Sequence, residues 1–132
     1  IEFISPSIVE AVQSNIAAEA PVAFDFERED RRENWQVLID HKLIEWGRNP
    51  GRFVDESVEA PSGTTVRRAI ELAEQFRDQG FIPPDSVVPD ANGGIVFERR
   101  ENGVSEVFHV WDDGKVEYLR FVGTRLVERW AF

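Results

Sequence analysis

The stretch that decides the fold is VVPDANGGIVFERRENGVSEVFHVWDDGKVEYLRF, residues 87–121. Apolar and polar residues alternate along most of it, as they do in strands that bury one face. Asn102 with Gly103 and Asp113 with Gly114 are strong signals for two-residue hairpin turns, because such turns need positive φ at both positions. The stretch therefore predicts an antiparallel β-meander of three strands, to which the segment after Gly123 adds a fourth.

Two-residue turns would also fix the register of the strands. In the first hairpin Phe97 then lies opposite Phe108, and in the second Phe108 faces Leu119. One sheet face is therefore expected to form the core with the helices. Its residues are Ile95, Phe97, Phe108, Val110, Leu119 and Phe121.

The opposite sheet face is predicted to carry aromatic and charged residues. In this register His109 lies between Val96 and Tyr118. Aromatic residues and Arg are enriched at protein interfaces, whereas a His beside a phenol and a carboxylate can instead transfer protons. We expect an interaction surface made of Glu98, His109, Trp111, Tyr118 and Arg120.

Three helices are predicted before the sheet. The first begins at Ser5, the second begins with Asp30 and Glu33 in a capping-box pattern, and the third runs from Ser62 to Gly80. The segment VAFDFE between the first two reads either as a short strand or as a connector. Each helix has an apolar face, which predicts that the helices pack on one face of the sheet.

The fold class that follows is α+β, with three helices packed on one face of a three- to four-stranded antiparallel β-meander. Its 132 residues fit a single domain, 1–132. Residues 1–60 are expected to form the N-terminal helices and a connector, and residues 61–132 the last helix and the meander.

Composition narrows the classes of function. The net charge of −10 argues against binding nucleic acid, whose partners usually present a basic surface. Cysteine is absent, and two His residues are too few for a multi-His metal site. No apolar run approaches the ~18 residues of a membrane helix. We expect an acidic cytoplasmic protein without cofactor or metal, and with no nucleic-acid or membrane partner.

Three segments carry a resemblance: PSGTTVRRAIELAEQF, then FIPPDSVVPDANGGIVFER, then EVFHVWDDGKVEYLR. Together they resemble a group of small uncharacterised bacterial proteins, in which a helix leads through a Pro-rich turn to a Gly-Gly strand and an Asp-Gly hairpin. The match covers roughly residues 61–122. It implies a fold, and it carries over no catalytic residue.

The sequence lacks the GxGxxG, GxxxxGK[ST] and GxSxG motifs. We therefore expect a non-enzymatic protein-interaction module that binds a protein partner or itself, for instance as a homodimer. Two alternatives stay open. One is an antitoxin-like or immunity protein for a basic partner, suggested by the acidic charge. The other is a small enzyme that uses His109 with Tyr118 or Glu98.

Overall fold

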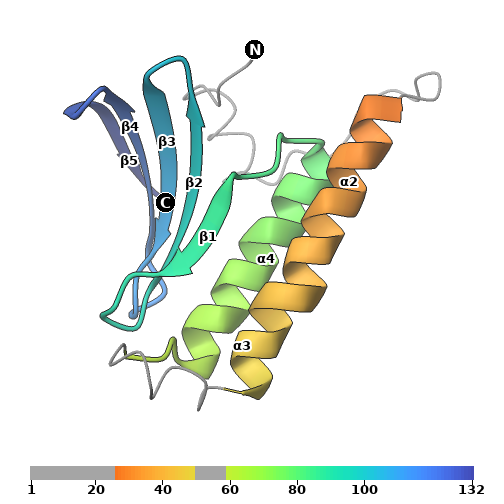
Figure 1. Cartoon of the computed structure of the whole chain (residues 1–132). Coiled ribbons are helices and arrows are strands. Elements are labelled where there is room, and N and C mark those ends of the chain that lie inside the picture. The colour runs from red at the N-terminus through yellow and green to blue at the C-terminus, as the bar shows by residue number, and fades with distance from the viewer. Residues whose placement is uncertain (1–25, 50–58) are drawn as a thin grey trace.

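The computed structural model describes residues 26–49 and 59–132, which form two layers (Figure 1). The first layer holds two helical rods. One rod is continuous and consists of α2 (Phe26–Leu38), a π-helical turn η1 (Ile39–Leu43) and α3 (Ile44–Arg48). The other rod is α4 (Gly63–Gln79), which runs antiparallel to the first.

The second layer is one antiparallel sheet with the strand order β1-β2-β3-β4-β5. The strands are β1 (Ser86–Pro89), β2 (Ile95–Glu101), β3 (Val104–Val110), β4 (Val116–Val122) and β5 (Arg125–Ala131). The predicted α+β class and the meander are confirmed, but the sheet has five strands and not three or four. The prediction missed β1 because prolines surround it; Pro89 is tolerated at the end of an edge strand.

The described part of the chain holds two helical rods where three helices were predicted. The first predicted helix and most of VAFDFE lie outside the described residues. The capping role predicted for Asp30 is wrong, because this residue lies inside α2. The bounds predicted for α4 are confirmed: Ser62 Oγ accepts a hydrogen bond from Thr65 N (3.1 Å), and Gly80 ends the helix in the left-handed conformation.

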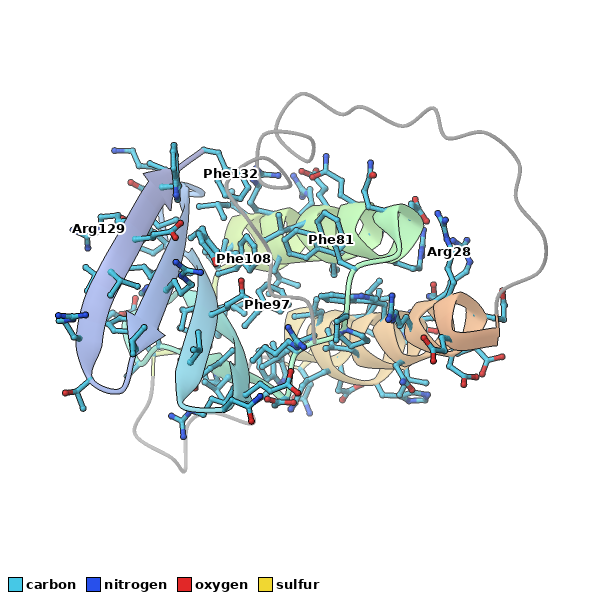
Figure 2. All side chains as sticks on the ribbon, turned by 90° about the horizontal axis from the view of Figure 1, so that it is seen from above. Arg28, Phe81, Phe97, Phe108, Arg129 and Phe132 are labelled. Atoms are coloured by element: carbon cyan, nitrogen blue, oxygen red, sulfur yellow. The ribbon has the colours of Figure 1, made fainter. Side chains whose placement is uncertain are left out.

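The core lies between the two layers, where α4 packs on β2 and β3. The ring centroids of Phe76 and Phe108 are 4.6 Å apart, and those of Trp35 and Phe76 are 5.5 Å apart. Figure 2 shows Phe97 and Phe108 between the sheet and the helices. Trp35 also donates its indole N–H to the Phe81 carbonyl (2.8 Å), which ties α2 to the chain after α4.

The predicted register is correct for the first hairpin and wrong by one residue for the second. Phe97 does lie opposite Phe108, but Phe108 pairs with Tyr118 and not with Leu119. The reason is the turn between β3 and β4, which spans residues 111–115. Trp111 N donates to the Lys115 carbonyl (2.8 Å), and Gly114 N donates to the Trp111 carbonyl (2.9 Å).

A slip of one residue exchanges the two faces of β4. Tyr118 is fully buried beneath the helices and donates its hydroxyl to a carboxylate oxygen of Glu106 (2.5 Å). Arg120 shares this helix-facing side. Leu119 and Phe121 lie on the opposite face, so their predicted place beneath the helices is wrong, although Leu119 is buried where it lies.

We predict that Tyr118 ionises only when the protein unfolds. Burial, and after it the hydrogen bond to the Glu106 carboxylate, raises the pKa of Tyr118 far above its ordinary value of about 10. Because the folded-state pKa is the higher one, the buried phenol stabilises the fold fully below about pH 10 and less as the pH rises further. Tyr118 is the only tyrosine, so phenolate absorbance reports on it alone.

The measurement is an alkaline titration that follows phenolate absorbance and circular dichroism together, with the denatured chain as the control. We expect the two signals to change together, above the pH at which the denatured chain titrates. A phenolate signal near pH 10 with unchanged circular dichroism would contradict the register and place Tyr118 in solvent.

Candidate interaction surface on the outer sheet face

The outer face of the sheet is the face opposite the helices, and no described helix or strand lies over it (Figure 1). Two of the predicted surface residues, Glu98 and His109, lie on this face, and Trp111 lies in the turn that follows β3. His109 pairs with Val96 as predicted. Tyr118 and Arg120 are on the helix-facing side instead, and this corrects the predicted surface.

Six apolar residues cross the outer face diagonally, and we call them the outer stripe. They form three cross-strand pairs, which are Val88 with Val96, Val107 with Leu119, and Phe121 with Leu126. Val88 is 46% exposed and Leu126 is 42% exposed, although Leu119 is only 9% exposed. A β-bulge next to Phe121 brings Leu126 into the outer stripe, because regular pairing would place Val127 opposite Phe121. The stripe therefore touches all five strands.

Charged residues on the outer face are neutralised in pairs. Glu98 binds Arg100 (2.8 Å) and Glu117 binds Arg129 (3.0 Å). Figure 2 shows Arg129 on the side of the sheet away from the helices. The outer face is thus close to neutral, although the chain as a whole carries −10.

Asp90 and His109 make the third polar pair of this face. One carboxylate oxygen of Asp90 accepts the backbone N–H groups of Asn92 (2.7 Å) and Gly94 (2.8 Å). The other oxygen accepts from Nε2 of His109 (2.6 Å). Burial alone would raise the pKa of Asp90, but these hydrogen bonds lower it more, so the pKa lies below its ordinary value. Asp90 therefore holds the loop between β1 and β2 against β3.

Trp111 is fixed flat against His109. The two rings stack with their centroids 3.7 Å apart and their planes at 22°. The indole N–H of Trp111 donates to Glu117 (2.7 Å), whose other carboxylate oxygen binds Arg129. Trp111 is thus held by His109 of β3 and by Glu117 of β4. We call His109 and Trp111 the rigid aromatic corner of the outer face.

This geometry does not bring together the proton-transfer group that was considered from the sequence. His109 and Tyr118 lie on opposite faces of the sheet, and Glu98 binds Arg100. The partner of His109 is Asp90, which the sequence did not single out because the pairing depends on how the loop between β1 and β2 folds back. Glu117 was missed for a similar reason, since the predicted register placed it on the other face.

Charged groups also occur on the helix-facing side. Glu106 is 2% exposed and pairs with Arg99 (3.4 Å), which also binds Glu101 (2.8 Å). A cavity of only about 20 Å³ lies beside them, with aromatic walls that include Trp35 and Phe97. Tyr118 and Arg99 both donate to Glu106, so the buried carboxylate is hydrogen-bonded and paired.

Within residues 26–49 and 59–132, no group of three or more His, Asp or Glu side chains is placed to hold a metal ion. The same residues contain no helix with the length and apolar character needed to cross a membrane. Comparison of the chain with protein-family models, with curated proteins and with solved structures gives no match. The resemblance seen in the sequence therefore stays a prediction.

Gly94 is required for the contact between Asp90 and His109. A Cβ atom at this position would overlap the Asp90 carboxylate and would lie 2.7 Å from the Val110 carbonyl oxygen. We predict that Gly94→Ala displaces the carboxylate and lowers the free energy of unfolding by about 1–3 kcal/mol, as overpacking does. Denaturant unfolding measures the loss, and the imidazole NMR signal of His109 reports the displacement.

The matched control is Gly63→Ala at the start of α4, where no atom lies within 4 Å of the added methyl group. Its stability should stay within about 0.5 kcal/mol of wild type. Equal effects of the two substitutions would show that Gly94 has no special steric role.

We predict that Asp90→Asn makes the protein less stable by about 1–3 kcal/mol at neutral pH, because it removes hydrogen bonds to a charged acceptor. Since the folded-state pKa of Asp90 is lowered, its stabilising effect is full above the ordinary pKa of about 3.9 and is lost as the pH falls below it. The deficit of the variant should therefore shrink in acid. Unfolding measured from pH 7 to pH 2 tests this, and a deficit that stays constant over that range would contradict it.

Proposed function

We propose that this protein is a non-enzymatic protein-interaction module and that it binds through the outer face of its sheet. The observation that supports this most directly is the outer stripe. Six apolar side chains lie together on a face that the described helices leave uncovered. Contiguous apolar patches of this kind on a folded protein are typical of binding surfaces.

The rigid aromatic corner supports the same proposal. His109 and Trp111 are already held by Asp90 and Glu117, so binding a partner would cost little conformational entropy at these side chains. Aromatic side chains are also enriched where proteins bind each other. In this proposal Glu98, His109 and Trp111 flank the outer stripe. Tyr118 and Arg120 support the surface from behind.

The outer face supports this proposal better than the two alternatives. An antitoxin or immunity protein for a basic partner would be expected to present acidic groups, whereas the charges of this face neutralise one another. An enzyme that uses His109 with Tyr118 would need the two side chains on one side of the sheet. An antitoxin or immunity function would therefore have to use another surface of the protein.

Site-specific photo-crosslinking in the native host tests the proposal. A photoreactive residue is placed at Val88 or at Leu126 on the outer face, and at Glu71 on the exposed side of α4 as the control. We expect crosslinks to protein from the two outer positions and not from Glu71. Adding Val88→Asp should reduce the product formed at Leu126 about tenfold, since each 1.4 kcal/mol of lost affinity is a factor of ten.

Two results would contradict the proposal. One is a crosslinking pattern that is the same at Glu71 as at the outer positions. The other is the absence of any crosslinked protein at Val88 and Leu126 while the protein is folded.

A further inference from the structure

We infer that the partner on the outer face is a second copy of this chain, packed sheet against sheet. The inference rests on the proposed function, because it names the partner of the same surface. It is carried by the local charge, the area and the symmetry of the outer face, and by the charges that protect the sheet edges.

The local charge favours a second copy. Two chains of −10 each repel one another as whole molecules, so they can associate only where the contact surface is nearly neutral. On the outer face Glu98 is paired with Arg100, and Glu117 is paired with Arg129. The remaining repulsion is weakened by salt beyond a Debye length of about 8 Å. A strongly charged partner of either sign would gain little on such a face.

The area is sufficient for a dimer. The strands lie about 4.8 Å apart and rise ~3.3 Å per residue; with four strands of seven residues and β1 of four, they present a face of roughly 500 Å². Two such faces bury about 1,000 Å² together, the lower limit of a specific protein interface. Sheets that pack face to face lie about 10 Å apart, a distance that apolar side chains of this size fill.

The outer stripe also suits a two-fold axis. In a symmetric dimer the same patch must complement itself. The two-fold axis would lie midway between the two sheets. If it runs along the stripe or at right angles to it, the stripe of one copy lies on the stripe of the other. Val107 in the middle of the sheet would then lie at the centre of the interface, with Val88 and Leu126 toward its ends. The His109 and Trp111 corner would lie beside them.

Pairing through the sheet edges is less suitable than pairing through the face. The edge strand β5 carries exposed Arg125 and Arg129, and the other edge strand, β1, ends in Pro89. Charged residues and proline are features that protect edge strands from pairing. The outer stripe contains no charged residue and no proline, so we assign the self-association to the face.

Sedimentation velocity over a range of protein concentrations tests the inference. We expect wild type to dimerise, and we expect Val88→Asp and Leu126→Asp each to raise the dimer dissociation constant at least about tenfold. Val88 is 46% exposed and Leu126 is 42% exposed in one copy, so these variants should fold. The matched control is Val37→Asp, at a valine that is 55% exposed on α2, and it should leave the dissociation constant unchanged.

Added salt gives a second readout. Because the interface is apolar and salt screens the repulsion between the copies, the dimer dissociation constant should stay the same or fall as salt increases. A wild-type protein that stays monomeric at every concentration would overturn the inference. So would a Val37→Asp variant that dissociates as readily as Val88→Asp.

The crosslinking experiment separates this failure from failure of the proposed function. Outer-face products that contain only a second copy support both statements. Products that contain a different protein overturn the dimer and leave the interaction module standing. Products that join the outer face to residues 1–25 of the same chain overturn both.

Discussion

The turn at residues 111–115 is the constraint on which the rest of the structure depends. It holds five residues, and its length sets which residues of β4 lie opposite β3. Because side chains alternate along a strand, that length decides which side chains of β4 meet the helices. Tyr118 faces the helices, and Leu119 faces away from them. The core composition and the outer surface are therefore both consequences of one loop.

The buried carboxylate of Glu106 makes this register favourable. A carboxylate beneath the helices is costly unless donors surround it, and Tyr118 and Arg99 both donate to it. In the register of a two-residue turn, Glu106 would face Phe121 and would lose the phenol hydroxyl. The turn and the buried polar group thus favour the same register, as expected when local and tertiary preferences agree.

Much of the fold could be predicted from the sequence, because its strongest signals are local. The caps at Ser62 and Gly80 and the turn at Asn102 each have a physical cause within a few residues. The second turn could not be predicted, since an Asp-Gly pair fits turns of more than one length and only the burial of Tyr118 distinguishes them. The site was predicted in part for the same reason. His109 was placed on the outer face, whereas its partner Asp90 comes from a loop whose path depends on tertiary contacts.

The same turn gives the sheet two apolar faces. Ile95, Phe97 and Phe108 are covered by the helices, while Leu119 and Phe121 join Val107 on the other side. Burying apolar surface is favourable by about 25 cal/mol per Å², so a sheet with two apolar faces is most stable when both faces are packed against other groups. The described helices provide one. A shorter turn would bury these two residues of β4 and would leave Tyr118 and Arg120 outside, so the loop that builds the core also builds the surface on which a partner can bind.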